Sequence, residues 1–535
     1  MARFIPNYYN LACVIFVALG SCACSYGQSI IGSTIGQPSF YTAFNLAKQG
    51  QPGYSETSKL ISAMNGVMTA GSIFGTAFTA WFADKWGRRV AVQIGTSVMI
   101  VGIVLVSGSV NMAMFLIGRF IAGFGIGNLM TIVPLYQAEI STPEQRGFMV
   151  CMHGVMVSVG YGGASWIGFG CYFAYPSGDS TFPWRFPLAF NMVPNLVLLV
   201  GSFWLPSSPR WLLGKGREDE AFQTLRRLHR TKDDPEELHI KREFYQMKSQ
   251  LEYDKESKQG LGRFPLFSTA HNRKRAALAF LLMFGNEFTG VLVIANYGVL
   301  LYTSLGLKTY VPLLLAAVWV TLAIFGNLFA ALYLDRVGRR LFLLIGLGGI
   351  CITNTLECAL QARYLGSSNL AGQRAAVFFI FMFIVFWSGF CDATQYTYIA
   401  EIFPTATRAE GVAFGTLGYY FGVLITLIAG PIALDNLGWR FFIVLIACPA
   451  AVWLMVFFFL PETKGKSLED INEAFGDKVA VHYQGASKEE DEQYWKSTEM
   501  NDQGYIKGAD LKPEKHDMEP EHLEEAPEQK GRAAQ

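Results

Sequence analysis

Long apolar runs, rather than short runs with a helical or strand period, dominate the pattern of hydrophobic and polar positions in this chain. A helix of about 20 apolar residues spans the roughly 30 Å hydrocarbon core of a bilayer. The runs predict twelve spans, with expected bounds of 9–31, 60–82, 90–109, 113–136, 148–172, 186–205, 275–303, 311–334, 341–363, 375–402, 411–431 and 439–460. The predicted fold class is an all-α membrane protein with twelve transmembrane helices, because the run lengths argue against a soluble helical core.

Two polar segments divide the predicted spans into regions. Residues 207–274 are rich in basic and acidic side chains and are expected to form a cytoplasmic linker with short helices. They separate an N-terminal six-helix bundle, residues 1–206, from a C-terminal six-helix bundle, residues 275–461. Residues 462–535 are expected to form a cytoplasmic tail that is mostly disordered, because its later part is polar and acid-rich.

Two copies of one motif indicate that the halves are duplicated. The pattern D-x-x-G-R-R occupies residues 84–89 and again residues 335–340. Further along the chain, each copy is followed by a glutamate and, seven residues later, by an arginine. Two signals that repeat in the same order are typical of the internal repeats found in many transporters.

The charged residues of these repeats are candidates for a gate. The planar guanidinium group of arginine suits pairing with carboxylates, so Arg88 and Arg339 are expected to meet Glu139 and Glu401, or nearby acids, across helix ends. Such pairs would latch the cytoplasmic side of a carrier that faces outward, since a rocking carrier needs contacts that break in one state. The alternative is that these residues only mark topology and cap helices. The candidate gating residues are Asp84, Arg88, Glu139, Arg146, Asp335, Arg339, Glu401 and Arg408.

The distribution of charge predicts the orientation of the chain. Basic residues gather in the second, fourth, eighth and tenth loops between spans and in the central polar stretch. Cytoplasmic loops carry an excess of Lys and Arg, so this side is expected to be cytoplasmic, with both termini on it, in a plasma membrane. The net charge of +1 implies no nucleic-acid partner. The nine cysteines lie in or beside apolar runs without metal spacing, so no metal site, cofactor or disulfide framework is expected.

Further motifs lie at the ends of the spans. Residues 206–212 read P-S-S-P-R-W-L, residues 401–404 read E-I-F-P, and residues 461–465 read P-E-T-K-G. Together with the repeats, these motifs resemble the sugar porter family of the major facilitator superfamily over about residues 9–475, and the chain looks most similar to fungal members. The resemblance implies two pseudo-symmetric six-helix bundles and a secondary active or facilitative carrier that works by alternating access.

The positions that contact sugar in this family differ here. Residues 286–292 read N-E-F-T-G-V-L where the family has Q-Q-x-S/T-G-x-N, and residues 392–396 read D-A-T-Q-Y where the family has G-P-x-P-W. Gly154 takes the place of a sugar-binding glutamine. Gly27 takes the place of the acid of proton-coupled members, so Arg119 would lack the partner that it has in them. The resemblance thus implies the architecture of a carrier more than one particular solute.

Two acids lie deep within the predicted spans. Charged groups at membrane depth are unfavourable and usually face a cavity, so Glu287 and Asp392 are expected to do so. Spacings of three and four residues place Gln395 and Tyr396 on the same helix face as Asp392. The candidate substrate-binding residues are Asn286, Glu287, Thr289, Asn296, Tyr297, Asp392, Gln395, Tyr396 and His153.

Each of these side chains also has a structural alternative. Four residues of the seventh span are expected to share a face: Asn286, Thr289, Asn296 and Tyr297. The alternative for the Asn and Thr residues is hydrogen bonding between helices. For the two acids the alternative is a structural hydrogen bond, and for His153 it is a packed histidine. Tyr420 and Trp387 are candidate aromatic platforms, although helical spacing places Trp387 off the face of Asp392.

The sequence therefore predicts a transporter of a small hydroxylated solute, a sugar or polyol. Proton symport through Glu287 or Asp392 and facilitated diffusion both remain open. The alternatives are a carrier or exporter of a non-sugar metabolite, and a nutrient sensor whose C-terminal tail recruits cytoplasmic partners. An enzyme is not expected, because the sequence contains no phosphate-binding glycine loop, nucleophile elbow or metal cluster. The expected partners are the solute and the lipid bilayer, with no nucleic acid.

Overall fold

The computed structural model describes residues 7–35, 37–47, 51–142, 145–174, 181–230, 237–257, 265–304, 310–364, 369–404, 407–466 and 470–476. Every regular element within these ranges is a helix. This confirms the predicted all-helical fold class. The tail predicted to be disordered from about residue 477 lies outside the described residues.

Each predicted span overlaps a long helix or a closely joined pair of helices. The helices of the first half are α1 (Tyr8–Ile35), α3 (Tyr54–Trp86), α4 (Arg88–Ser107), α5 (Met112–Ile140), α6 (Arg146–Ala174) and the pair α7 (Phe182–Phe190) and α8 (Met192–Gly201). Those of the second half are α12 (Ala270–Glu287) with α13 (Val291–Ser304), α14 (Val311–Val337), α15 (Arg339–Tyr364), α16 (Leu370–Phe386) with α17 (Asp392–Glu401), α18 (Arg408–Leu437) and α19 (Phe441–Phe459). Eleven of these segments are long and apolar enough to cross a membrane, and only α3 is less apolar than that.

The outer surface of these helices is apolar. Phe74 is 52% exposed, Phe325 is 65% exposed and Phe458 is 68% exposed. Soluble proteins rarely expose broad apolar surfaces. The exposed side chains fit a hydrocarbon environment, and they support the reading of these helices as membrane spans.

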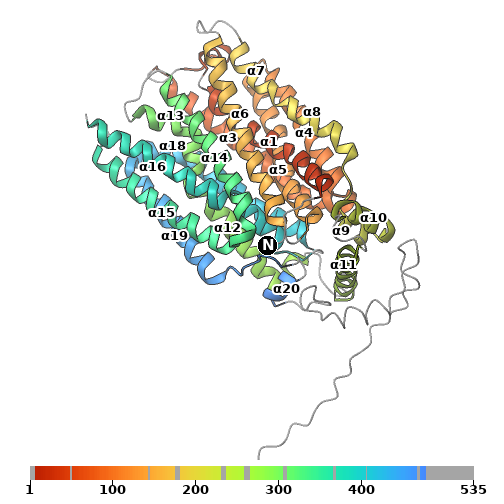
Figure 1. Ribbon diagram of the computed structural model, residues 1–535. Coiled ribbons are helices and arrows are strands. Elements are labelled where there is room, and N and C mark those ends of the chain that lie inside the picture. Colours follow the sequence, from red (N-terminus) through yellow and green to blue (C-terminus); the bar gives the residue numbers. More distant parts are fainter. Residues whose placement is uncertain are drawn as a thin grey trace, which may run out of the picture. The chain divides into compact units, whose positions relative to one another are not determined.

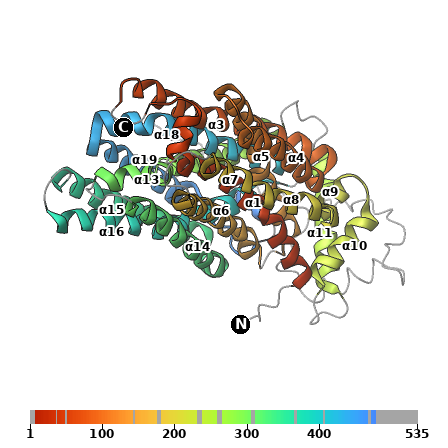
Figure 2. The same cartoon turned by 90° about the horizontal axis from the view of Figure 1, so that it is seen from above.

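The two halves meet along two pairs of helices. α14 of the second half packs along α6 of the first half, and α18 packs along α3. Figure 1 shows the helices of the two halves side by side, and Figure 2 shows α6 beside α14 and α3 beside α18. Both halves belong to one compact unit of the chain, residues 1–483. A region enclosed by these two contacts is therefore lined by side chains from both halves.

Helix α3 packs closely against α5 through small residues. Gly71 and Gly75 stand four residues apart on α3, and Gly123 and Gly127 do so on α5. A Cβ atom added at any of these four positions would collide with a backbone carbonyl oxygen of the facing helix. Glycines at this spacing allow membrane helices to approach closely.

A leucine in place of Gly75 is expected to destabilise the first half strongly. Its side chain would have to occupy the position of the Phe124 carbonyl oxygen, so α3 and α5 would separate and lose their packing. We expect a lower apparent melting temperature of the purified protein and less folded protein after size-exclusion chromatography. Gly170→Leu is a matched control, because no atom lies within 4 Å of a Cβ added at Gly170. Equal melting temperatures of the two variants would contradict this account.

Short helices occupy part of the polar stretch between the halves. They are α9 (Pro209–Gly214), α10 (Glu218–His229) and α11 (Leu238–Ser257), and they lie together at one end of the long helices in Figure 1. Leu213, Leu225 and Phe244 belong to a small apolar core of their own. Four shorter helices complete the described structure: α2 (Pro38–Ala43), η1 (Ser202–Trp204), η2 (Pro265–Phe267) and η4 (Gly438–Arg440), with α20 (Asp470–Ala474) as a last short turn after α19.

His229 fastens these short helices to the end of α5. Its Nδ1 atom lies 2.7 Å from the Glu243 carboxylate, and its Nε2 atom lies 2.9 Å from the Ile140 carbonyl oxygen. Both partners are acceptors, and only the protonated imidazolium ring has two N–H donors. Burial disfavours the charged ring, but the Glu243 carboxylate and the two hydrogen bonds outweigh burial and raise the pKa of His229 above its ordinary value of 6.5. Although burial also opposes the charged form of Glu243, the His229 imidazolium lowers the pKa of Glu243 below 4.5.

The attachment of α10 and α11 is therefore expected to depend on pH. The charged form of His229 stabilises the attachment fully below pH 6.5, and this stabilisation is lost as the pH rises through the raised pKa of His229. The charged form of Glu243 stabilises it fully above pH 4.5, and this stabilisation is lost as the pH falls through the lowered pKa of Glu243. Hydrogen exchange of α10 amides should show that His229→Gln weakens the attachment by about 1.5–3 kcal/mol near pH 6, the usual worth of a hydrogen bond to a charged group. The difference from the wild type should shrink at about pH 9. An equal difference at both pH values would show that charge plays no part.

Candidate functional site

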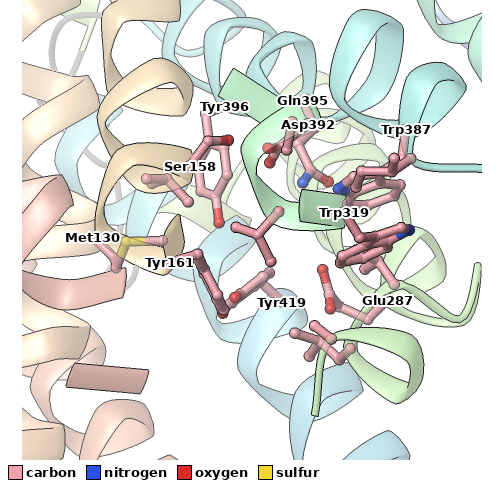
Figure 3. Close-up of a pocket in the computed structure, with 17 residues that line it drawn as sticks. Met130, Ser158, Tyr161, Glu287, Trp319, Trp387, Asp392, Gln395, Tyr396 and Tyr419 are labelled. Atoms are coloured by element: carbon pink, nitrogen blue, oxygen red, sulfur yellow. The ribbon is translucent and has the colours of Figure 1, made fainter. Parts of the chain in front are cut away.

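A cavity with an empty volume of about 570 Å³ lies between the two halves. Figure 3 shows Tyr161 and Ser158 on one side of the cavity and Trp319, Trp387 and Glu287 on the other. Its lining residues are Met130, Val157, Ser158, Tyr161, Glu287, Val291, Leu292, Ala295, Trp319, Val320, Ala323, Ile384, Trp387, Asp392, Gln395, Tyr396 and Tyr419.

Glu287 enters the cavity where the seventh span is broken. The span was predicted as one helix over 275–303, but α12 ends at Glu287 and α13 begins at Val291. Gly290, between them, has a φ of +101°, a conformation that glycine adopts without strain. The break changes the helix phase between Asn286 and Asn296, which the prediction of one shared face did not take into account.

Glu287 has an unusual environment for an acid. It is 1% exposed, and neither of its carboxyl oxygens has a hydrogen-bond partner among the described residues. Gly422 of α18 provides the room for it, because a Cβ atom at Gly422 would lie 2.8 Å from the Glu287 Cβ atom. An isolated buried carboxylate is unfavourable by several kcal/mol. This group therefore requires a proton, a cation or a hydrogen-bond donor inside the cavity.

The face of α17 that was predicted from helical spacing does line the cavity. Asp392, Gln395 and Tyr396 all take part in it. The Asp392 Oδ2 atom accepts a hydrogen bond of 2.8 Å from the Asn327 amide, and the Gln395 Oε1 atom accepts one of 2.8 Å from the Asn286 amide. Asn286 thus lies behind the cavity wall and orients Gln395.

Trp387 lines the same cavity as Asp392, contrary to the expectation from helical spacing. Residues Trp387–Cys391 form a π-helical turn, η3, between α16 and α17. A π-helix has more residues per turn than an α-helix, so residues five apart come closer to one face. The expectation assumed an unbroken α-helix over 375–402. Single π-helical turns are frequent at functional sites in membrane and soluble helices.

Several lining residues were not predicted from the sequence. Trp319 donates from Nε1 to the Ile380 carbonyl oxygen at 2.9 Å, which fixes the indole ring against the cavity. Tyr161 donates from its hydroxyl to the Gln28 Oε1 atom at 3.1 Å. Tyr419 lines the cavity, whereas its neighbour Tyr420, the predicted platform, does not. Within an apolar span, an aromatic residue of this kind looks like a packing residue, so the sequence carried no signal for them.

Three other predicted residues do not belong to the cavity lining. Thr289 donates to the Asn286 carbonyl oxygen at 2.7 Å, and Asn296 donates to the Leu292 carbonyl oxygen at 3.0 Å. His153 is buried, its Nδ1 atom lies 2.8 Å from the Ser21 hydroxyl, and its ring centroid lies 4.5 Å from that of Tyr396. It packs behind the Tyr396 ring rather than lining the cavity. The side chain of Tyr297 lies outside the described residues.

Asn327 connects the two halves beside the cavity. Its Nδ2 atom lies 2.8 Å from both the Asp392 carboxylate and the Ser158 hydroxyl. Asn327 and Asp392 belong to the second half, and Ser158 belongs to α6 of the first half. This amide bridge therefore ties an acid of the cavity to the opposite half.

The predicted arginine–glutamate contacts exist within each half. Arg88 lies 2.9 Å from Glu139, and Arg339 contacts Glu401 twice, at 2.7 and 3.1 Å. The four side chains are nearly fully buried. Each glutamate also accepts a hydrogen bond from a hydroxyl group. Ser208 donates to Glu139, and Thr463 donates to Glu401.

The contact between halves is made by Asp335 instead. Its Oδ1 atom accepts from the Gly147 amide at 3.0 Å, and its Oδ2 atom accepts from the Phe148 amide at 2.7 Å. These amides lie in the first turn of α6, so Asp335 caps a helix of the opposite half, and the helix dipole favours its negative charge. Asp335 also holds Arg339 at 2.9 Å. The predicted arginine–glutamate pairs each join helices of a single half, whereas Asp335 contacts the opposite half beside the second pair.

The other predicted gating residues occupy the same end of the helices. Arg146 donates to the Lys466 carbonyl oxygen at 3.4 Å, and this contact also joins the two halves. Arg408 donates from Nε to the Phe403 carbonyl oxygen at 3.1 Å. Asp84 lies 3.4 Å from Arg88 and has a half-exposed side chain.

The geometry suits reversible binding of a small polar solute. The cavity combines two carboxyl groups and a carboxamide with phenol and indole rings. Carboxylates and amides can hydrogen-bond hydroxyl groups, and aromatic rings cover the apolar faces of a solute. Nearly all of these groups are buried, and contacts between the halves close one end of the helices. Movement of one half against the other would open the cavity.

The family model, the relatives and the solved structure that are similar to this chain are all described as transporters. A family model described as "Sugar (and other) transporter" matches residues 13–475. The MFS-type transporter criB of Aspergillus cristatus is 30% identical to this chain over 88% of its length and 94% of the relative's length. The sugar transporter STL1 of Saccharomyces cerevisiae is 26% identical over 84% of this chain and 78% of that protein. The solved structure of the proton:xylose symporter XylE bound to 6-bromo-6-deoxy-D-glucose shares 21% identity and has a TM-score of 0.77, covering 88% of this chain and 100% of that one.

Proposed function

This chain belongs to the sugar (and other) transporter family of the major facilitator superfamily, and on that premise we propose that it carries a small hydroxylated solute, a sugar or polyol, across a membrane by alternating access. The observation that carries the proposal is the cavity between the halves, where Asp392 and Gln395 stand among aromatic rings. Carriers with internal repeats bind their solutes at such an interface near the middle of the membrane.

The walls of the cavity fit a solute with hydroxyl groups. The fixed Trp319 ring offers an apolar face, and Gln395, oriented by Asn286, offers an amide to hydroxyl groups. Asp392 offers acceptors from the same face of the helix. Relatives named as sugar transporters support this class of solute.

Alternating access requires that the contacts between the halves form and break. Two contacts would open when the cavity faces the cytoplasm. One is the cap that Asp335 forms on the first turn of α6, and the other is the hydrogen bond from Arg146 to the Lys466 carbonyl oxygen. The buried pairs Arg88–Glu139 and Arg339–Glu401 would stay intact and keep each half rigid. The gate is thus proposed to consist of helix capping across the halves, with ion pairs as its supports.

Other parts of the proposal concern coupling and placement. Glu287 is proposed to exchange a proton during the cycle, because its buried carboxyl group has no partner among the described residues. Residues 1–206 and 275–461 are proposed as the two rocking bundles, residues 207–274 as a cytoplasmic linker and 462–535 as a cytoplasmic tail. A plasma-membrane location is also proposed, and the basic loops support a cytoplasmic placement of both termini. No catalytic role is proposed for any residue.

A second candidate function is the transport of a non-sugar metabolite. The replacement of the family's sugar-contacting motif by Asn286 to Leu292, with an acid at position 287, favours it. A nutrient sensor on the same fold is a third reading, and the tail that would recruit its partners lies outside the described residues.

A counterflow assay with a panel of solutes separates these functions. The purified protein is reconstituted into liposomes preloaded with one unlabelled solute, and uptake of the labelled form is measured. We expect sugars or polyols to drive counterflow, and Gln395→Ala to reduce it at least about tenfold, since a site that hydrogen-bonds a hydroxyl group depends on its polar groups. Counterflow by non-sugar solutes alone would favour the second candidate. No counterflow with any solute would contradict transport.

A further inference from the structure

A second, smaller cavity inside the first half contains a buried cation. It has an empty volume of about 340 Å³ and is lined by Gly27 of α1, Met99 of α4, Arg119 of α5 and Asn191, between α7 and α8. All of its lining residues belong to the first half, so it is separate from the cavity between the halves. The side chain of Arg119 is 2% exposed.

The partners of Arg119 are all neutral. Its Nε atom donates to the Met64 carbonyl oxygen at 3.4 Å, its Nη1 atom to the Gly27 carbonyl oxygen at 3.4 Å, and its Nη2 atom to the Asn65 amide oxygen at 3.2 Å. These distances are at the long end of the hydrogen-bond range, and a guanidinium group has five N–H donors. Among the described residues, no carboxylate lies within ion-pair distance of Arg119.

Two other buried arginines of this protein show the contrast. Arg88 and Arg339 each meet a buried glutamate at less than 3 Å. Arginine stays protonated in proteins, and a buried charge without a counter-charge is unfavourable by several kcal/mol. The guanidinium group of Arg119 therefore requires negative charge from outside the described side chains.

The cavity holds a second donor beside Arg119. Gly27 has no side chain, and a Cβ atom added there would lie 2.8 Å from Nδ2 of Asn191 and 3.2 Å from the Met99 methyl group. The Asn191 Nδ2 atom and the Arg119 guanidinium group thus both lie beside Gly27, because the guanidinium group donates to the Gly27 carbonyl oxygen. Asn191 is 2% exposed. An arginine and an amide N–H pointing at one small volume form a donor set for an anion.

We propose that Arg119, with Asn191, binds a small monovalent inorganic anion, chloride, in the cavity at Gly27. The rest of the lining is apolar, with Ile30, Ile103 and Ile126 among its members. Such a lining cannot replace the strong hydration of a divalent anion, because it offers few hydrogen-bond donors. Chloride needs only a few donors and loses its water more easily. The bound anion would neutralise the only arginine in this cavity and hold α1, α5 and the α7–α8 junction together.

The thermal stability of the full-length protein in detergent tests the proposal. Chloride is varied from about 1 to 300 mM against gluconate at constant total salt, and unfolding is followed by tryptophan fluorescence. An anion that binds only the folded protein raises the melting temperature with the logarithm of its concentration. We expect a rise of about 3 °C or more for the wild type. Equal melting temperatures in chloride and in gluconate would overturn the proposal.

A variant that supplies the negative charge covalently gives a second, independent test. Gly27→Asp places a carboxylate beside Arg119, and only the flexible ends of Asn191 and Met99 need to shift. We expect this variant to lose the dependence on chloride and, in gluconate, to melt at a higher temperature than the neutral, equal-sized Gly27→Asn. General effects of salt act equally on both variants and cancel in this comparison. A chloride dependence of Gly27→Asp equal to that of the wild type would overturn the proposal, and so would equal melting of the two variants in gluconate.

Discussion

Replacing Arg339 with alanine is expected to destabilise the protein by about 3–5 kcal/mol, the usual effect of breaking a buried ion pair from one side. The guanidinium group of Arg339 is 1% exposed and is held by Glu401 at 2.7 Å and by Asp335 at 2.9 Å. Its removal leaves two acids without their cation, one of them fully buried. Repulsion between these acids would also disturb Asp335, which caps the first turn of α6 in the other half.

The loss can be measured by unfolding the purified protein with a denaturing detergent or by heating. Arg336→Ala is the matched control, because Arg336 stands in the same loop motif with an exposed side chain. Arg339→Met combined with Glu401→Leu should recover part of the stability, since no buried charge then lacks a partner at that position. If Arg339→Ala unfolds like Arg336→Ala, the pair is not a support of the second half.

The twelve spans could be predicted because the membrane imposes a length on every helix. Even α3 was found, although Gly71, Gly75 and several hydroxyl residues make it less apolar. What the apolar runs could not reveal is where a span breaks. The break after Glu287 depends on Gly290, and a glycine inside an apolar run has no distinct signal. The division into α7 and α8 and the π-helical turn at Trp387 were not predicted either.

The cavity could be predicted only where its residues are charged or share a regular face. Asp392, Gln395 and Tyr396 were found because an acid deep in an apolar run is unfavourable and its neighbours follow the helical period. Trp319 and Tyr161 were not found, because aromatic residues occur throughout such spans. Their roles depend on how α14 and α6 meet, and that contact joins residues far apart in the sequence.

The gate shows a similar limit. The sequence paired Arg88 with Glu139 and Arg339 with Glu401 correctly, since complementary charges at helix ends find each other. It could not show that each pair lies within its own half. The contact between the halves uses backbone amides of Gly147 and Phe148 as donors, and every residue except proline carries an amide, so no side-chain pattern marks it.

Replacing Glu287 with glutamine is expected to abolish the accumulation of solute driven by a pH gradient. Glu287 lines the cavity with no hydrogen-bond partner among the residues that the structure describes, and glutamine imitates its neutral, protonated form. If the proton on Glu287 must bind and leave once in each cycle, a permanently neutral side chain still permits exchange of solute but no longer couples it to protons. A gradient of one pH unit supplies about 1.4 kcal/mol, which corresponds to tenfold accumulation for one proton per solute. The variant should therefore equilibrate the solute to a ratio of one.

The measurement uses proteoliposomes with an imposed pH gradient and the solute identified by counterflow. Glu357→Gln is the matched control, because Glu357 is also a buried acid of the second half, is hydrogen-bonded by Gln361 at 2.8 Å, and does not line the cavity. It should keep the accumulation of the wild type. Accumulation by Glu287→Gln equal to that of the control would exclude Glu287 as the proton-carrying group. Loss of both accumulation and exchange would instead indicate that Glu287 holds the solute itself, because a neutral carboxyl group and an amide differ in the hydrogen bonds that they offer to a bound solute.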